Sequence, residues 1–579
     1  MELETEKVMQ MKSTIFDSLS ALAKMPNKDT ENWLQSAEEG VQFLKHTCES
    51  NKEIFLYASG PHCHMESILV LRDRVTPPNH ADLAAAHLMI DDTWLIQRSC
   101  SGKKDHRIYL EPPLSFAGCQ TLEGGEKLVF RRNFEGVKNY QPELELNQKL
   151  VHSLELYYMD ESSAYCRLDR HGDLEKIITV FDDKNSDHLQ RTCAITIRGR
   201  DLAKYMALSS TAFVTKFDFT RFRSGSFYGW GETERKVFQS KDLYYQYGVM
   251  PNHASYANGH IVLHAKLTED DLIEEWKAEE DSRNMQYTSF KILDRKNKKL
   301  VETSCGPEYI VNYFTKSDLP WEISPAFFRP EVLLKYKNDP EKYTIKDRSI
   351  NCREAWHLET YDINEAGQVH TYIGYLAKLP FEEQLYWQSF NEWPKDGISK
   401  RAFQTDILGE FSTEDDPLAE LKGIIKSLDR DAPSWWNPRG EVLIEEVLHP
   451  ATDTIEEWGN EILALYQLVV EGFRVKGLRS IIGDHEGTYE KRWGSLKLIE
   501  VMLSRLGRTE EEARNLVQPL KELNSLRISA KAHGNPAGRQ AAVVNARKSH
   551  GNLREHFQNL VGSIRDSIKK IVSILSKNP

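Results

Sequence analysis

An arginine and a histidine near the C-terminal end of the chain have the types and spacing of a phosphodiester-cleaving pair. Arg527 is followed by five residues and then by His533. A guanidinium matches phosphate oxygens as a planar fork, and an imidazole titrates near neutral pH, so the two could bind a phosphate and transfer a proton. A structural interpretation stays open. His533 directly precedes Gly534, with Pro536 beyond it, and this is the pattern of a helix C-terminus.

Further basic residues follow this pair, and a short pattern repeats among them. The run Lys531-Ala-His533-Gly534-Asn535 recurs as Lys548-Ser-His550-Gly551-Asn552, where Asn552 suits the N-cap of a final helix. A solvated basic face explains this composition as well as an anion-binding surface does. For the second interpretation we expect nucleic acid to contact Lys531, Arg539, Arg547, Lys548, His550 and Arg554.

A second candidate for nucleic-acid binding lies in the segment from Phe217 to Lys236. Its cations and aromatic rings alternate, which is typical of surfaces that hold phosphates and stack on bases. We expect Arg221, Arg223 and Trp230 to bind there. The glycines lack the spacing of a Walker loop or a dinucleotide fingerprint. Strand aromatics that pack into a core are the alternative.

The sequence predicts no metal site and no cofactor. His62 and His64 can share one face of a strand, but a metal would need further ligands from elsewhere, such as His80 or His87. The eight cysteines are scattered, without a close CxxC pair. Reduced thiols in the cytoplasm are the simplest interpretation.

Charge is distributed unevenly along the chain. The formal net charge is −12, which argues against a generic nucleic-acid coat. Residues 514–579 nevertheless hold twelve Lys and Arg against three Asp and Glu, a net charge of +9, which leaves −21 for the rest. Residues 409–461 hold fourteen acids and four bases. A nucleic-acid partner is therefore expected at one end only. Covering the basic segment, or docking on it, is an alternative role for the acidic segment.

The C-terminal segment resembles the HEPN superfamily of nucleotide-binding domains, on the Arg527–His533 spacing within a basic helical region. This resemblance implies a helical bundle, often a metal-independent ribonuclease of toxin and antiviral systems, that acts as a dimer of bundles. Arg527 would bind phosphate, and His533 would serve proton transfer at the ribose 2′-hydroxyl. Where the family often has a polar residue after the arginine, this chain has Ile528.

Residues 61–410 look like uncharacterised bacterial proteins that carry segments such as AYCRLDRHGDLE and PFEEQLYWQSFNE. Together with the helical end, this resemblance implies a sensor and effector of a bacterial antiphage defence or stress system. We therefore expect an RNA-cleaving effector that the N-terminal body regulates. A non-catalytic protein that binds nucleic acid or a partner through its basic helices is the alternative.

The spacing of apolar residues predicts the elements that must position these side chains. We expect a multidomain α+β chain, in which a β-rich mixed body is followed by an all-α bundle. We expect an N-terminal helical segment (1–60), a strand-rich body (61–330), a hairpin-containing subdomain (331–410), an acidic linker with a short helix at 417–428 (411–452), and a bundle of four helices (453–579). We also expect a helix at 201–208 that Asp201 caps, beside Arg198 and Arg200. No apolar run is long enough for a membrane helix, and the first residues do not form a signal peptide.

Overall fold

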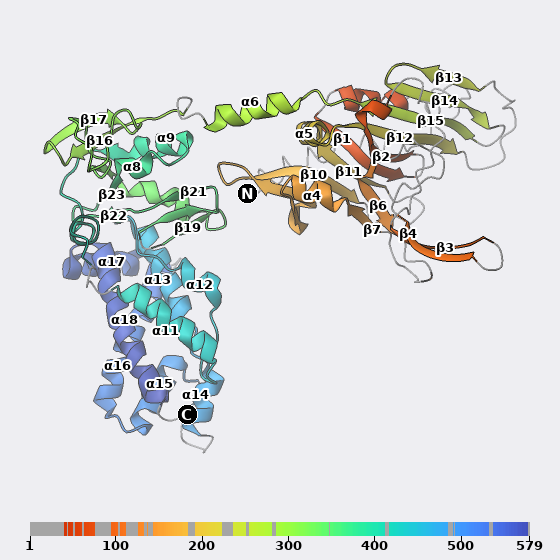
Figure 1. Ribbon diagram of the computed structural model, residues 1–579. Helices are drawn as coiled ribbons and strands as arrows, with labels where there is room; N and C mark the ends of the chain where they lie inside the picture. The colour runs from red at the N-terminus through yellow and green to blue at the C-terminus, as the bar shows by residue number, and fades with distance from the viewer. Residues whose placement is uncertain are drawn as a thin grey trace. The chain divides into compact units, whose positions relative to one another are not determined.

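The structure is a computed structural model, and two compact units make up the chain (Figure 1). Unit 1 comprises residues 1–169 and 173–285, and unit 2 comprises residues 170–172 and 286–579. The structure describes residues 40–576 except residues 43, 50–51, 61–62, 76–93, 102–104, 112–124, 133–135, 137–142, 183–191, 223–234, 251–253, 281–284, 347, 411–415, 484–489, 491 and 532–535. Most of the predicted N-terminal helical segment lies outside these residues, although residues 40–42 and 44–49 are helical.

Unit 1 is built on one large antiparallel sheet with the strand order β13-β14-β15-β12-β2-β1-β11-β10-β9-β8, and β5 pairs with β2 (Figure 1). The strands are β1 Glu53–Gly60, β2 Cys63–Leu71, β5 Glu126–Lys127, β8 Tyr157–Met159, β9 Ala164–Leu168, β10 Leu174–Asp182, β11 Cys193–Arg198, β12 Thr211–Phe222, β13 Lys236–Gln239, β14 Leu243–Met250 and β15 Ala254–Leu263. Side chains alternate between the two faces of such strands, so each strand contributes to two layers.

Two apolar clusters hold this sheet. In one, the helices α4 (Gln148–Ser153) and α5 (Gly199–Ser209) contribute side chains that pack with β1, β10 and β11. In the other, the helical residues 40–49 contribute Val41 and Leu44, which pack with Phe217 and Phe219 of β12. The predicted helix at 201–208 is confirmed as part of α5, but α5 begins at Gly199, and Asp201 is a buried ion-pair partner instead of its N-cap.

Unit 1 also contains two separate hairpins and a further helix. β3 (Leu95–Ser101) pairs only with β4 (Asp105–Glu111), and β6 (Val129–Arg132) pairs only with β7 (Glu143–Leu146). The helix α6 (Glu269–Glu280) follows β15.

Unit 2 begins with a smaller antiparallel sheet, β17-β16-β18-β23-β22, in which β24 also pairs with β18, and a three-stranded sheet, β19-β20-β21 (Figure 1). The elements are β16 Ser289–Asp294, β17 Lys299–Ser304, β18 Pro325–Phe328, α7 Leu334–Lys337, β19 Tyr343–Ile345, β20 Ile350–Cys352, β21 Trp356–Leu358, β22 Asp362–Ile363, β23 Val369–Tyr372, α8 Ile373–Leu376, α9 Phe381–Phe390, β24 Asn391–Glu392 and α10 Lys400–Ala402. Because β18 pairs with both β16 and β23, one sheet spans residue 330, where the sequence suggested a boundary.

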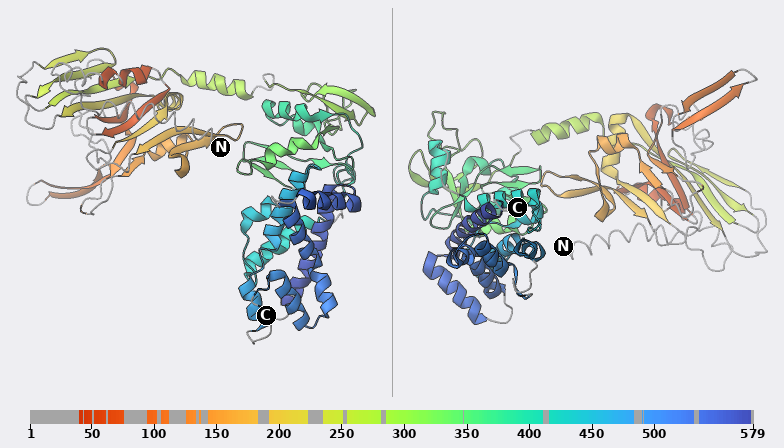
Figure 2. Two further views of the ribbon diagram at one scale, coloured as in Figure 1. Left: turned by 180° about the vertical axis from the view of Figure 1, so that it is seen from behind. Right: turned by 90° about the horizontal axis from the view of Figure 1, so that it is seen from below.

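The remainder of unit 2 is helical, which confirms the predicted change from a strand-rich body to an all-α C-terminal region. The helices are α11 Pro417–Asp431, α12 Gly440–Glu446, α13 Ile455–Val469, α14 Val475–Ile482, α15 Ser495–Arg505, α16 Glu510–Lys531, α17 Pro536–His550 and α18 Leu553–Ser576. They lie side by side in all three views (Figure 1 and Figure 2). Six of them, not the predicted four, fall within the described residues after 453. The expected cap is present, since the side chain of Asn552 accepts from the Glu555 amide. Thr509 and Glu512 also cap each other at the start of α16.

The segment predicted as an acidic linker packs into this helical core over its described residues, 416–452. Leu421 and Ile425 of α11 and the pair Trp435 and Trp436 are buried in one cluster with α13, α16 and α18. The acids are on the outer faces of these elements, whereas their apolar residues recur at helix spacing. The segment therefore belongs to the bundle. Among the described residues, no helix has the length and apolarity to cross a membrane.

Candidate functional site

The predicted catalytic arginine lies on the last turns of α16. Arg527 is half-buried, and its guanidinium carbon lies 4.7 Å from the ring centroid of Tyr466 on α13. Such a cation–π contact orients a guanidinium without neutralising it. Among the described residues, no carboxylate lies within ion-pair distance of Arg527. Its charge is therefore available to an anion.

His533 lies outside the described residues, in the connection 532–535 between α16 and α17, and the side chain of Lys531 lies outside them too. The described residues that adjoin this connection are Lys531, the last residue of α16, and Pro536, the first residue of α17. Arg527 lies four residues before Lys531, about one helical turn from the end of α16. The pairing of Arg527 with His533 therefore stays a prediction.

A second arginine follows this connection in the sequence. Arg539 is on the first turn of α17, three residues after its first residue Pro536, and it is half-buried. Its Nε is enclosed and has no hydrogen-bond partner among the described residues. A buried polar group without a partner is costly, so this N–H is suited to a ligand acceptor. We call Arg527, His533 and Arg539 the α16–α17 turn site.

The other predicted basic residues lie at the far end of α17 and have different surroundings. Arg547 is exposed and forms an ion pair with Asp453 at 2.8 Å, and Lys548 is exposed. With a rise of about 1.5 Å per residue, Lys548 is about 14 Å from Arg539 along the helix. The two ends of α17 therefore form two basic patches.

His550 and Arg554 face inward from the second patch. The His550 ring contacts the ring of His556, with centroids 5.1 Å apart, and burial lowers the pKa of His556 to about 4. Arg554 makes no hydrogen bond or ion pair within the described residues. Burial lowers the pKa of its guanidinium, which the nearby Asp362 raises. Neither side chain belongs to an open basic surface.

Acidic groups from the preceding segment neutralise part of the basic surplus. Glu420 of α11 binds both Arg565 and Lys569 of α18, at 2.7 and 2.6 Å. These two bonds lower the pKa of Glu420. Asp453 binds Arg547 and also accepts from the Leu553 amide at the start of α18. Among the described residues, the cations of this region without a carboxylate partner include Arg514, Arg527, Arg539, Lys548 and Lys570, so the remaining surplus is spread along α16, α17 and α18.

The second predicted patch cannot be placed. Residues 223–234, with Arg223 and Trp230, lie outside the described residues, and so does the side chain of Arg221 at the end of β12. Near the start of α5, Arg198 binds Glu175 and Asp201 at 3.0 and 3.1 Å, and Arg200 binds Glu275 at 2.9 Å. Both arginines are paired with carboxylates, so their charges are already neutralised at the start of α5.

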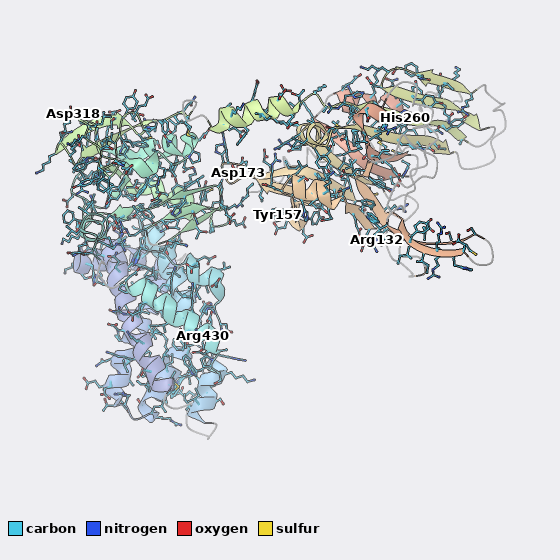
Figure 3. All side chains as sticks on the ribbon, viewed as in Figure 1. Arg132, Tyr157, Asp173, His260, Asp318 and Arg430 are labelled. Carbon is cyan, nitrogen blue, oxygen red and sulfur yellow. The ribbon has the colours of Figure 1, made fainter. Side chains whose placement is uncertain are left out.

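Sequence reasoning missed a polar row that crosses the large sheet of unit 1. The strand register places Glu66 between Tyr57 and Lys216, and His260 between Lys216 and Tyr244. Cross-strand partners project on the same face of a sheet, so these side chains form one row (His260 is labelled in Figure 3). The residues come from five strands that lie between residues 53 and 263, and only the register of these strands could have revealed the row.

Glu66 is the buried centre of this polar row. It is 4% exposed, and its Oε1 lies 3.1 Å from Nε2 of His64. Its Oε2 has no hydrogen-bond partner in the described part of the chain. Burial lowers the pKa of Lys216, while the charges of Glu66 and Asp218 raise it. A buried carboxylate oxygen without a donor is costly in a folded protein. This face is therefore a second candidate for a ligand site.

Among the described residues, no group of three or more His, Cys, Asp or Glu could hold a metal ion. No family model, curated protein or solved structure matches the chain. The function proposed below is therefore inferred from the geometry of this chain.

Proposed function

We propose that the helical region of unit 2 is an RNA-cleaving effector that acts at the α16–α17 turn site. The observation that supports this proposal concerns Arg527 near the end of α16 and Arg539 near the start of α17. Neither has a carboxylate partner among the described residues, and His533 lies between them in the sequence. Two guanidiniums can hold the nonbridging oxygens of one phosphate and stabilise the charge that develops in the transition state.

The chemistry assigned to the site is transesterification at phosphorus. His533 would accept the proton of the ribose 2′-hydroxyl while the 2′-oxygen attacks the phosphorus. The bond from phosphorus to the 5′-oxygen of the next nucleotide then breaks, and this oxygen takes up the proton from the His533 imidazolium. The products are a 2′,3′-cyclic phosphate and a free 5′-hydroxyl. The step requires no metal, since the arginines offset the phosphate charge and the imidazole moves the proton.

Cleavage of a synthetic oligonucleotide tests this mechanism. The substrate is DNA with one ribonucleotide, and the full chain should cut only after that ribose, in EDTA, and leave a cyclic phosphate. We expect Arg527→Ala and His533→Ala to lower the rate at least about 100-fold, the usual effect of removing a transition-state donor or a general base. Arg514→Ala, an exposed position on the same helix, is the matched control.

A cellular assay complements the test, because an effector can require an activating signal. Expression of the chain should halt growth and fragment RNA, and Arg527→Ala and His533→Ala should each abolish both effects while the protein stays folded. Intact RNA with the unaltered chain under activating conditions, or equal cleavage by all variants, would overturn the proposal.

The alternative is a non-catalytic protein that binds nucleic acid at the other end of α17. The exposed Lys548 next to Arg547 favours it. In that case Lys548→Ala should weaken RNA binding and reduce the slope of log affinity against log salt by about one, and Arg527→Ala should behave like Arg514→Ala.

In the same proposal, unit 1 is the sensor, and the polar row around Glu66 is its ligand site. The unsatisfied Oε2 of Glu66 calls for a ligand that donates N–H groups, such as an amine or the amino edge of a nucleobase. Glu66→Gln should then remove the response of the effector to its signal without changing the basal cleavage rate.

A further inference from the structure

The hairpin β3–β4 of unit 1 carries a cysteine and a histidine directly opposite each other. The register pairs Cys100 with His106, and Sγ of Cys100 lies 3.4 Å from Nε2 of His106. Both residues are exposed, and Cys100 is the one exposed cysteine within the described part of the chain. Thiolate and imidazole are the ligands that zinc prefers in structural sites.

The separation of these two atoms fits a shared metal ion. With a zinc–sulfur bond of about 2.3 Å, a zinc–nitrogen bond of about 2.0–2.1 Å and a tetrahedral angle, the sulfur and nitrogen ligands of one zinc lie about 3.5 Å apart. The observed 3.4 Å is therefore one edge of a zinc tetrahedron. Nothing has to move except the thiol proton, which leaves when the thiolate binds.

One hairpin supplies only two of the four ligands that a structural zinc site needs. Among the described residues, no third His, Cys, Asp or Glu completes a metal cluster. A second copy of the chain brings the same two ligands, and a two-fold axis through the metal would give the tetrahedral Cys2His2 set.

The same face of the hairpin carries three exposed apolar side chains and one arginine. Because side chains alternate along a strand, Ile96 and its partner Leu110, and Ile108 and its partner Arg98, project on the face that carries Cys100 and His106. Ile96 is 70% exposed and Ile108 is 71% exposed. A two-stranded hairpin is marginally stable in water unless its apolar face packs on something.

The dimensions of two packed hairpins agree with a metal between them. Sheets that pack face to face lie about 10 Å apart, so a zinc ion on the two-fold axis is about 5 Å from each hairpin. A cysteine sulfur that projects from its strand and bonds zinc at about 2.3 Å spans that gap.

We propose that β3–β4 is a zinc-dependent dimerisation hairpin, in which Cys100 and His106 of two copies bind one Zn²⁺ while the Ile96, Ile108 and Leu110 faces pack together. The balanced step is two thiols, two imidazoles and one Zn²⁺ giving the four-coordinate complex and two protons. This inference is independent of the proposed ribonuclease activity, since its test measures metal and mass and not RNA cleavage.

Titration of the reduced full chain with Zn²⁺ tests the site. We expect one Zn²⁺ bound per two chains, release of about two protons per zinc in buffers of different ionisation enthalpy, and a doubled mass by light scattering that EDTA reverses. Co²⁺ in place of zinc should give the absorption bands of a tetrahedral site with thiolate ligands.

Matched variants separate the site from general effects. Cys100→Ser and His106→Ala should each abolish the cobalt bands and the zinc-dependent dimer, with the thermal unfolding of the apoprotein unchanged because both side chains are exposed. Cys193→Ser and His357→Ala, elsewhere in the chain, should bind zinc as the unaltered chain does. Ile108→Asp should weaken zinc-dependent dimerisation about tenfold or more, since it removes apolar contact area but no ligand.

Several results would overturn the proposal. Absence of tight zinc binding would remove the site, and one zinc per chain without a change in mass would show that its ligands come from a single copy. A dimer that reductant dissolves but EDTA does not would show a disulfide between Cys100 residues instead of a metal.

Discussion

Replacing Lys337 by methionine should destabilise unit 2 strongly, because this lysine neutralises two buried carboxylates. Its Nζ lies 2.5 Å from Glu457 and 3.0 Å from Glu461 of α13, and it also donates to the backbone oxygen of His449. The three side chains are only about a tenth exposed. The group joins α7, next to the smaller sheets, to the helical core of the same unit.

The expected loss follows from the charges that the variant leaves behind. Methionine has nearly the volume of the lysine stem, so the cavity is small, but two carboxylates remain buried without their cation. Removing one partner of a buried ion pair costs about 3–5 kcal/mol, whereas an exposed pair contributes about 0–1 kcal/mol. Lys426→Met is the matched control, because Lys426 pairs with Glu445 at 2.8 Å and both side chains are about half exposed.

The loss should depend on pH in a defined direction. Burial raises the pKa of Glu457, but Lys337 and the hydrogen bonds from Thr452 and Ala451 lower it by a larger amount. The net pKa is therefore below the usual 4.5. Its contribution to stability is therefore present above about pH 4.5 and is lost as the pH falls through the lowered pKa. Burial raises the pKa of Glu461 despite Lys337. Without the lysine, both carboxyls should bind protons more readily, so the variant should lose stability as the pH rises from about 5 to 7.

Urea unfolding followed by circular dichroism at 222 nm, which reports mainly on the helices of unit 2, measures the effect at pH 5 and pH 7. We expect Lys337→Met to lose about 3–5 kcal/mol at pH 7 and clearly less at pH 5, and Lys426→Met to lose less than about 1 kcal/mol at both. Equal losses for the two variants, or a Lys337→Met loss that does not change with pH, would refute the reasoning.

Three further outcomes are expected. Asp362→Asn should lower the free energy of unfolding by about 3 kcal/mol, because the buried carboxylate accepts from Arg401 at 2.9 and 3.0 Å and its pKa is lowered. In the unaltered protein this contribution is present above about pH 4 and is lost at lower pH. Urea unfolding at two pH values can measure it. Gly259→Ala should disrupt the pairing of β14 with β15, since an added Cβ would lie 2.0 Å from the backbone oxygen of Tyr244; hydrogen exchange should increase in residues 243–263 and stay unchanged in α11–α18. Arg527→Ala should cost less than about 1 kcal/mol in thermal unfolding, the value of a cation–π contact with Tyr466, so a greater loss would mean a structural role that the contact does not explain.

Much of the local structure was predictable, because it depends on neighbours in sequence. The expected helix at 417–428 lies within α11. Three segments rich in turn residues, 169–173, 294–298 and 364–367, join antiparallel strands. Turn residues, capping side chains and apolar spacing act over a few positions, so the sequence states them directly. The burial of Trp435 and Trp436 was also predictable from their size.

The candidate sites were only partly predictable. Spacing indicated Arg527 and His533, but it gave no sign that Arg539 flanks the same connection or that Arg547 pairs with Asp453. Charge counting treated the basic end as one surface. In the structure, Arg539 and Lys548 lie near opposite ends of α17. Glu420 neutralises two further cations, Arg565 and Lys569 of α18.

What the sequence determined by itself is therefore the kind of element at each position, the change from strands to helices, and the types of side chain available for chemistry. The tertiary structure decided which of these meet. Strand register assembled the polar row around Glu66, where β2 meets β12, and helix packing made the acidic segment part of the bundle core. The physical reason is that propensity and periodicity act locally, whereas register and packing are settled by contacts between residues that are tens to hundreds of positions apart.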